Sequence, residues 1–411
     1  MDEMHALLLK IIGAALFGGD VPAIRREQIE NLFSEAGAQA VFSILFHTLD
    51  SQMKELLSSN EYAAYSERFL VHAIAGAQNF AEHGELHDLM TENNIPYTTL
   101  KGISSAMYYP DPGLRNMGDV DFLVNIGDLQ AAGRVLEMAG FTVDHGEEEN
   151  SKHIAYRRPP ASIWEMHRSV NGIPENTIGE RIKEEINRVI ETSETVNVDG
   201  NVCCVPDKLH HGLILLLHTA SHLTSEGVGL RHLCDWIVFA SSMSDTEFKE
   251  LFEKKLKEFG LWQFAQVLTS IGICYMGAPK RKWAWEVIES NRVDEEVLKK
   301  LLEDILNGGN FGTKDMNRYR EIKYISDDKG KINNNGILLQ GFKSLNIRVY
   351  DNSKIIRKYK ILLPMGWIKE GTKYFGLLLS GKRKKTDTRK MFNEASERKR
   401  IYRQLKLFDV F

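Results

Sequence analysis

The sequence predicts an α+β fold, with a small mixed β-sheet core flanked by helical regions. Apolar residues recur at helical spacing in residues 1–85 and 205–308, whereas residues 86–200 alternate between strand-like and helical segments. At about 150 residues per domain, 411 residues correspond to two or three packed units. We therefore expect an N-terminal helical region (1–85), an α/β core (86–200), a helical region packed on that core (205–308), and a C-terminal part (309–411).

The composition is that of an ordinary globular chain. Hydrophobic residues make up 43% and charged residues 26%, which excludes a mostly disordered, collagen-like or polytopic membrane protein. The four cysteines form no C-x-x-C pair, so a reducing compartment is a simpler interpretation than a disulfide or zinc framework. The N-terminus is acidic where a signal peptide needs positive charge, and Leu7–Phe17 is too short to span a membrane. We expect a soluble, cytoplasmic protein.

Charge is unevenly distributed along the chain. The formal net charge is −4, but residues 381–411 sum to +7 and residues 1–380 to −11. The default interpretation of the basic tail is a solvated, partly helical segment. Contact with a polyanion, such as RNA or a membrane surface, is the alternative.

The two helical regions are predicted from periodicity and capping signals. In the N-terminal region, apolar positions at helical spacing occur in residues 7–16, 41–48 and 69–77. In the second helical region we expect helices over residues 207–223, with Asp207 as N-cap, and over 230–242, 245–259 and 261–275. Residues 309–340 are rich in Gly, Asn and Lys and predict a loop or linker. Apolar character returns over residues 355–379.

The core is predicted to contain short strands and helices in alternation. In chain order we expect a helix over 85–92, a strand over 96–100, a helix over 103–109, a strand over 119–124, a helix over 128–139 closed by Gly140, and a hairpin of residues 153–157 and 162–168 around Pro159-Pro160. This order of elements is typical of a small α/β unit.

The segment Gly118-Asp119-Val120-Asp121-Phe122-Leu123-Val124 is the most informative in the chain. On a strand, Asp119, Asp121 and Leu123 share one face, and the opposite face is wholly apolar. Two carboxylates at i and i+2 repel each other unless a cation lies between them, and Mg²⁺ binds carboxylates together with substrate phosphates. The pattern therefore favours a phosphoryl or nucleotidyl transfer site. By itself, it is also compatible with a solvated pair on an edge strand.

Two further segments strengthen the first interpretation. Lys101-Gly102 precedes Ser104 and Ser105 where a strand turns into a helix, and a helix N-terminus binds phosphate; an ordinary turn is the alternative. In Ile163-Trp164-Glu165-Met166-His167, Glu165 and His167 share one face of a strand, which would add a third carboxylate. A surface glutamate paired with an arginine is the alternative. The acidic run Glu147–Glu149 is interpreted as a solvated loop.

These segments together resemble the polymerase β-like nucleotidyltransferase superfamily. More closely, Leu100-Lys101-Gly102, Tyr109-Pro110, Leu114-Arg115 and the Gly118–Val124 segment resemble a bacterial group with an L-K-G … R-x-x-G-D-[IV]-D-[FL]-L-V signature. Glu165-Met166-His167 matches the later [DE]-[LM]-H element of that group. Weaker similarity extends over residues 86–380, through His218, His222, the Gly229–Trp236 stretch, and Leu362-Leu363-Pro364 ahead of Tyr374.

The resemblance implies transfer of a nucleoside monophosphate from an NTP, such as ATP, to an acceptor. It implies that Asp119 and Asp121 hold Mg²⁺ (or Mn²⁺), and that Glu165 ligates a second metal or helps to deprotonate the acceptor. Gly102 and Ser104 would cradle the triphosphate, with Ser105 as a further donor and Lys101 and Arg115 nearby. The resemblance does not identify the acceptor, which could be a small molecule, a protein or an RNA. In this chain Ile103 follows Gly102 where the superfamily has a second Gly or a Ser.

Several histidines lie outside this signature. His218 and His222 share a helix face, and with His211 or His232 they could form a zinc site. The general-base Glu of an H-E-x-x-H motif is absent between them, so packing or a role near the substrate is favoured over a zinc hydrolase. Arg231, His232, Asp235 and Trp236 begin a helix that could close the cleft or simply pack against another helix.

The sequence therefore leads to one main hypothesis and one alternative. The main hypothesis is a Mg²⁺-dependent nucleotidyltransferase that releases pyrophosphate. The alternative is a non-catalytic nucleotide-binding or partner-binding protein on the same scaffold.

Overall fold

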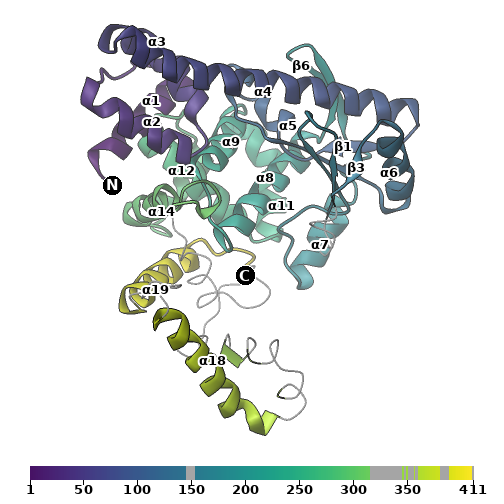
Figure 1. The fold of residues 1–411 in the computed structure, drawn as a ribbon, viewed down its shortest axis with the longest axis vertical. Helices are drawn as coiled ribbons and strands as arrows, with labels where there is room; N and C mark the ends of the chain where they lie inside the picture. Colours follow the sequence, from purple (N-terminus) through teal and green to yellow (C-terminus); the bar gives the residue numbers. More distant parts are fainter. Residues whose placement is uncertain are drawn as a thin grey trace.

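The computed structural model describes residues 1–144, 153–314, 345–346, 349, 356, 360–379 and 388–409. The acidic run Glu147–Glu149, most of the predicted loop 309–340 and the start of the basic tail, residues 381–387, lie outside these residues. The architecture is α+β, with a small mixed sheet beside a large helical body (Figure 1). The predicted fold class is confirmed.

The main sheet has five strands in the order β1-β2-β5-β4-β3. The strands are β1 (Tyr97–Thr99), β2 (Asp119–Val124), β3 (Thr142–Val143), β4 (His153–Arg157) and β5 (Ile163–His167). The central pair β2·β5 is parallel, and the other neighbours are antiparallel. The predicted 153–157/162–168 hairpin is therefore present. A separate hairpin of β6 (Glu194–Val198) and β7 (Asn201–Val205) lies against β1, where the backbone N–H of Cys204 donates to the Tyr97 hydroxyl.

One face of the main sheet is apolar and is covered by two helices. Val120, Phe122 and Val124 on β2 form a buried cluster with Trp164 and Met166 on β5. Helices α4 (Ser59–Glu92) and α6 (Leu129–Met138) complete this cluster. A one-residue shift in register would bring the β2 carboxylates into this cluster, so the apolar residues fix which face carries the acids.

Helix α4 joins the helical body to the sheet. It has 34 residues, starts at a capping box between Ser58 and Glu61, and runs across both parts of the molecule (Figure 1). Its N-terminal half packs through Tyr62, Tyr65 and Phe69 on the helical core, and its C-terminal half packs on the sheet. The expected boundary between residues 85 and 86 therefore falls inside one continuous helix.

The two predicted helical regions share one hydrophobic core. Helices α1 (Glu3–Phe17), α2 (Ile29–Ala38) and α3 (Phe42–Leu56) contribute to the same buried cluster as α8 (Lys208–Leu223), α9 (Leu230–Ser241), α12 (Trp262–Met276) and α14 (Glu295–Gly308). Helices α1 and α12 approach so closely that a Cβ atom on Gly13 would lie 1.9 Å from the carbonyl oxygen of Met276. The remaining helices are α5 (Ile103–Ala106), α7 (Thr177–Ile186), α10 (Asp245–Phe248), a π-helical segment (Lys249–Glu253), α11 (Lys254–Glu258) and α13 (Lys282–Glu289), with 3₁₀ turns at 26–28, 112–114, 126–128, 310–312 and 360–362.

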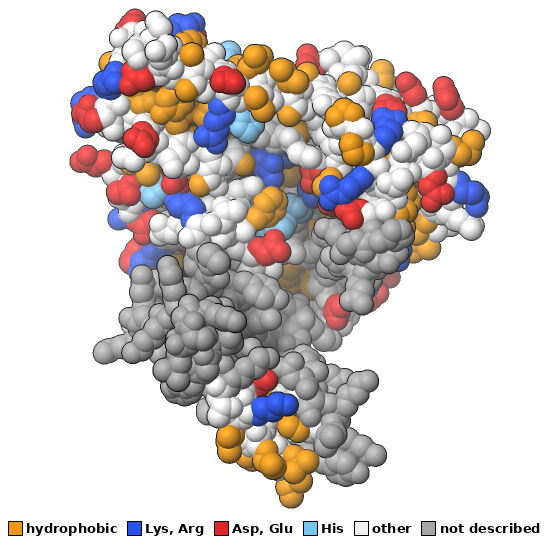
Figure 2. Space-filling model, viewed as in Figure 1, with side chains coloured by type: hydrophobic (Ala, Val, Ile, Leu, Met, Phe, Trp, Pro, Cys, Tyr) orange, Lys and Arg blue, Asp and Glu red, His pale blue; other side chains and the backbone are white. Residues whose placement is uncertain are grey.

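Two C-terminal helices follow, α18 (Leu363–Leu379) and α19 (Thr388–Gln404). Helix α19, which contains much of the basic tail, is anchored on α14: Arg398 and Tyr402 both donate hydrogen bonds to Asp304, at 2.9 and 2.7 Å. One face of this helix is packed, with Arg398 and Lys399 buried, whereas Arg400 and Arg403 are exposed. Exposed apolar side chains gather at the lower end of the molecule, around α18 (Figure 2). None of the described helices has the length and apolar character needed to cross a membrane.

Two predicted helices differ from the structure. Helix α5 ends at Ala106 rather than residue 109, because Pro110 disfavours the helical conformation of the residue before it. The single helix expected over 245–259 is divided by the π-helical segment. The helices starting at Lys208, after the Asp207 cap, and at Leu230 agree with expectation, and the expected closure of α6 by Gly140 is confirmed by its positive φ of 89°.

Candidate active site

Three carboxylates share the polar face of the sheet. In the parallel β2·β5 pair, Asp121 lies in register with Glu165, and Leu123 with His167. Side chains of residues in register project to the same side, so Asp119, Asp121 and Glu165 face away from the apolar cluster, as the alternation predicted. Leu123, on the same face, belongs to the core of the helical body. The polar face is therefore turned toward the helices.

Asp121 is the most enclosed of the three acids, with 2% of its surface exposed. Its Oδ2 lies 2.8 Å from Nζ of Lys101, and its Oδ1 lies 2.7 Å from Nε2 of His167. Burial opposes its ionisation, but the Lys101 ammonium and the hydrogen bond to His167 hold the pKa of Asp121 well below its usual range. Burial also disfavours the charged form of His167, yet its hydrogen bond to Asp121 raises the pKa of that imidazole. Asp121 is therefore a fixed negative charge.

The pKa of Asp119 is shifted in the opposite direction, above its usual value. The negative charge of Asp121, together with burial, raises the pKa of Asp119, and the nearby cations Lys101 and Arg231 offset this only in part. The pair thus carries unrelieved repulsion, which a bound cation would remove. This observation, and the all-oxygen donor set of the two aspartates, fit a hard divalent ion such as Mg²⁺.

Glu165 lies beside the aspartates. Its Oε2 is 3.5 Å from Nε2 of His167 and 3.9 Å from Nε2 of His153, and its side chain is about one-quarter exposed. His153, Glu165 and His167 each offer a ligand atom within 4.8 Å of the others. Glu165 is not one of the residues that line the cavity described next. His167 links it to Asp121, because Nε2 of His167 lies 2.7 Å from Oδ1 of Asp121 and 3.5 Å from Oε2 of Glu165.

A cavity lies between the polar face of the sheet and helices α8 and α9. It has about 480 Å³ of space free of atoms, part of it open to solvent, and Lys/Arg and His side chains lie in a hollow near the middle of the face in Figure 2. The residues lining it are Lys101, Gly102, Arg115, Asp119, Asp121, Leu215, His218, Thr219, Arg231, His232, Asp235 and Phe311. Five of the eight predicted site residues thus meet at one cavity.

The two serines after Gly102 lie behind the cavity wall. Ser104 is buried, and its hydroxyl is 2.5 Å from the Thr99 hydroxyl. Ser105 is also buried, and neither residue lines the cavity. Helix α5 has only four residues, so its dipole offers little to a phosphate. Gly102, with φ of +64°, brings bare backbone to the cavity.

Arg115 lines the cavity, but its charge is already paired. Its Nε and Nη2 donate to the two carboxylate oxygens of Asp235, both at 2.8 Å, and the Tyr109 hydroxyl donates to Asp235 at 2.7 Å. Burial disfavours the charge on Asp235, but Arg115 holds the pKa of that carboxyl below its usual value. This buried triad fixes helix α9 against the segment before β2. Arg115 is thus a positioning residue at the cavity wall.

Arg231 is a further cation at the cavity, which the sequence offered only as part of a helix that could close the cleft or pack against another helix. Its Nη1 donates to the carbonyl oxygen of Asn116 at 3.1 Å, and its guanidinium lies 5.8 Å from the ring centre of Phe311. Arg231, His232 and Asp235 line the cavity, so the start of α9 forms one of its walls. Trp236, the fourth residue considered with them, is buried in the core and donates to Thr269 at 2.9 Å.

Sequence reasoning missed two contributions to the site. The link from His167 to Asp121 follows from the shared face of Glu165 and His167 once β5 is placed beside β2, but the strand order is not visible in the sequence. Phe311 and Thr219 reach the cavity from elements distant in sequence, and no local signal marks them. His218 contacts Lys101 directly, at 3.2 Å between Nε2 and Nζ.

The chain matches one family of known proteins over more than half of its length. The model of a family described as uncharacterised nucleotidyltransferase matches residues 25–272, which include the three carboxylates and both helices that wall the cavity. Among solved structures, the chain is similar to an antigenic nucleotidyltransferase-like protein from Paracoccidioides brasiliensis. The identity is 16% and the TM-score 0.33, over 52% of this chain and 97% of that chain. No curated protein matches.

Proposed function

The chain belongs to the family described as uncharacterised nucleotidyltransferase, and we propose that it transfers a nucleoside monophosphate from an NTP to an acceptor, with release of pyrophosphate and dependence on Mg²⁺ or Mn²⁺. The observation that carries the proposal is the alignment of Asp119, Asp121 and Glu165 on one face of two parallel strands, beside a cavity with lysine and arginine side chains in its wall.

In this proposal Asp119 and Asp121 hold the metal, and Glu165 is the third carboxylate. Bound Mg²⁺ would supply the positive charge that neutralises the triphosphate and the charge developing during transfer. Asp121 contributes a permanent negative charge because Lys101 and His167 keep it ionised. Asp119 would be ionised more readily once a cation relieves its repulsion with Asp121.

The chain's own cations would bind the phosphates. Burial disfavours the charge on Lys101, but the charge of Asp121 raises the pKa of that ammonium, so Lys101 is positively charged at neutral pH. Lys101, between β1 and α5, and Arg231, in the first turn of α9, both line the cavity. Gly102 leaves room for a phosphate to approach the backbone. We propose that these three residues orient the NTP, and that Arg115, already paired with Asp235, keeps the α9 wall in place.

The proposed reaction forms one bond and breaks one. An acceptor oxygen or nitrogen attacks the α-phosphorus in line with the departing pyrophosphate. The new acceptor–phosphorus bond replaces the α-phosphorus–oxygen bond, whose electron pair leaves with pyrophosphate. The proton of the acceptor is lost to a base, a role for which the exposed part of Glu165 is the candidate. The acceptor itself is a small molecule, a protein or an RNA.

The test is a labelling screen. The purified full-length protein is incubated with cell extract, Mg²⁺ and each α-³²P-labelled NTP in turn, and the small-molecule, RNA and protein fractions are separated. The proposal expects label in one fraction, with stoichiometric pyrophosphate. Calorimetry with Mg²⁺–NTP runs in parallel. Nucleotide binding without label transfer to any fraction would instead support a non-catalytic nucleotide-binding protein.

A further inference from the structure

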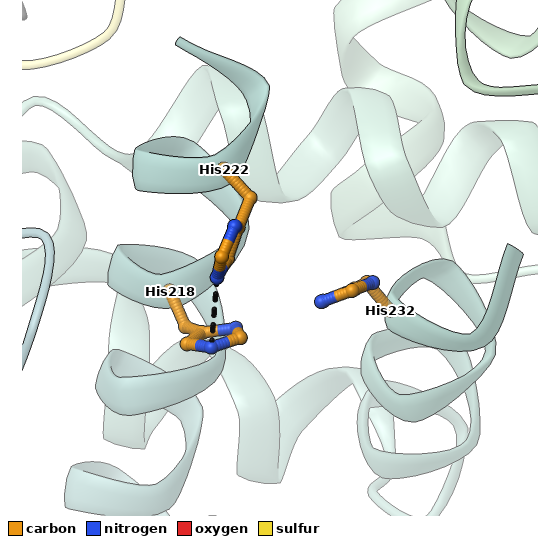
Figure 3. Close-up of side chains that lie close together, drawn as sticks. All are labelled: His218, His222 and His232. Atoms are coloured by element: carbon orange, nitrogen blue, oxygen red, sulfur yellow. Dashed lines mark hydrogen bonds between the residues drawn. The ribbon is translucent and has the colours of Figure 1, made fainter. Parts of the chain in front are cut away.

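Three histidines meet at the wall of the cavity, where α8 lies against α9. His218 and His222 are one turn apart on α8, and His232 is in the first turn of α9. Each offers a ring nitrogen, and these nitrogens lie within 4.8 Å of one another. Figure 3 shows His218 and His222 in contact and one ring nitrogen of His232 directed toward them. His211, the other histidine considered for such a cluster, instead stacks on Tyr108.

The described residues do not satisfy every ring nitrogen of this cluster with a hydrogen bond. Nε2 of His218 lies 3.1 Å from Nε2 of His222 and 3.2 Å from Nζ of Lys101. A neutral imidazole nitrogen has either one proton or one lone pair, and the Lys101 ammonium can only donate, so a lone pair of His218 that accepts from Lys101 is not free to accept from His222. Both ring nitrogens of His232 are buried without a hydrogen-bond partner among the described residues. Buried polar atoms normally have partners, and these nitrogens need one.

We propose that His218, His222 and His232 bind a divalent transition-metal ion, with Zn²⁺ as the physiological occupant. Three imidazoles with an open fourth position are a recurrent zinc ligand set, whereas Mg²⁺ requires oxygen ligands. Zinc–nitrogen bonds of about 2.0–2.1 Å in a tetrahedron place ligand nitrogens about 3.3 Å apart. The observed separation of 3.1 Å between His218 and His222 is close to that value. A metal would also give the partnerless His232 a ligand role.

The surroundings of the cluster support the proposal. A metal-binding histidine usually directs its second ring nitrogen at a carboxylate. Nδ1 of His222 is buried without a hydrogen-bond partner among the described residues, and Oε2 of Glu226 lies 3.7 Å from it, just beyond hydrogen-bond distance. The Phe311 ring packs edge-on against His222 and His232, with centroids 5.0 and 5.4 Å away, and covers the cluster from outside. His218 and His232 also line the cavity, so a metal here would lie in the wall of the same cavity as the carboxylates.

This site is separate from the carboxylate site and does not depend on the proposed transfer reaction. Its ligands come from α8 and α9, and those of the carboxylate site come from β2 and β5. Lys101 is the link between them, because its ammonium contacts both Asp121 and His218. We therefore expect the carboxylate site to prefer Mg²⁺ and the histidine site to prefer Zn²⁺.

The test is metal titration of the full-length protein without a histidine tag. Co²⁺ reports tetrahedral nitrogen ligation by its visible absorption, and competition with a chromogenic chelator gives the Zn²⁺ affinity. One equivalent of Zn²⁺ is expected. His222→Gln and His232→Gln should each weaken Zn²⁺ binding by more than about 100-fold. Glu226→Gln should weaken it by about 10–100-fold, since residues that contact a ligating histidine typically contribute that much to metal affinity.

Two matched variants serve as controls. His47→Gln changes an exposed histidine on α3, and His153→Gln changes the histidine beside Glu165. Neither should alter Zn²⁺ affinity. Wild-type affinity in His222→Gln, or loss of Zn²⁺ in His153→Gln instead, would overturn the proposal. If His232→Gln fails to fold by circular dichroism, His222→Gln, near the C-terminal end of α8, and Glu226→Gln, in the exposed turn that follows α8, still decide it.

Discussion

Asp235→Asn should destabilise the protein by about 3 kcal/mol, because it breaks a buried ion pair from one side. The Asp235 and Arg115 side chains are only 7% and 5% exposed, so solvent cannot replace the lost interaction. The asparagine can still accept one hydrogen bond, but its amide group would face the guanidinium with a donor. Tyr109→Phe removes a single hydrogen bond to the carboxylate and should cost less, about 1.5 kcal/mol.

Urea unfolding followed by circular dichroism measures both variants. With an m-value of about 3 kcal/mol/M, a loss of 3 kcal/mol moves the midpoint down by about 1 M. Glu247→Gln, which breaks the exposed pair with Lys208, is the control and should leave the midpoint unchanged. A midpoint for Asp235→Asn within about 0.3 M of wild type would refute the assignment of Arg115 and Asp235 as a buried, mutually dependent pair.

Three further changes have definite expected outcomes. Lys101→Met should weaken Mg²⁺–NTP binding by about tenfold or more in calorimetry, while Lys101→Arg retains part of it; equal binding in both would contradict its role. Burial lowers the pKa of His211 to about 3, so between pH 6.5 and 3 the unfolded state binds more protons than the folded state. The free energy of unfolding therefore falls as the pH is lowered over this range. Between pH 7 and 5 this costs about 2 kcal/mol, and His211→Phe should unfold with a correspondingly flatter pH dependence. Gly13→Leu should prevent α1 from packing on Met276 and lower the melting temperature, whereas an unchanged melting temperature would argue against that contact.

Much of the sheet could be predicted from the sequence because its signals are local. The Val/Phe/Val alternation in β2 fixes the strand, its buried face and the direction of Asp119 and Asp121 with no reference to the rest of the chain. Likewise, the placement of Glu165 on a strand with apolar neighbours predicted its face. The structure adds that β2 and β5 are adjacent and parallel. This pairing joins segments far apart in the sequence, so no local pattern predicts it.

The rest of the site depends on tertiary packing that no local pattern encodes. The resemblance places Arg115 near the triphosphate, whereas in the structure it is buried and paired with Asp235, 120 residues later. Ser104 and Ser105 were predicted to bind phosphate, but both are buried, and the Ser104 hydroxyl contacts the Thr99 hydroxyl instead. The length of α4 was also underestimated: the sequence marked residues 69–77 and 85–92 as separate helical segments, and the structure joins them in one helix, Ser59–Glu92.

The central claim is that the carboxylates of β2 and β5 act together in nucleotidyl transfer. It is tested most directly by measuring transfer of α-³²P label to the acceptor fraction with Asp119→Asn, Asp121→Asn and Glu165→Gln, against Asp20→Asn, an exposed aspartate in the loop after α1, as the matched control. We expect the transfer rate of each of the three site variants to fall by at least about 100-fold. Added Mg²⁺ should not restore the rate, and the control variant should keep wild-type activity. Wild-type transfer by both Asp119→Asn and Asp121→Asn would contradict it.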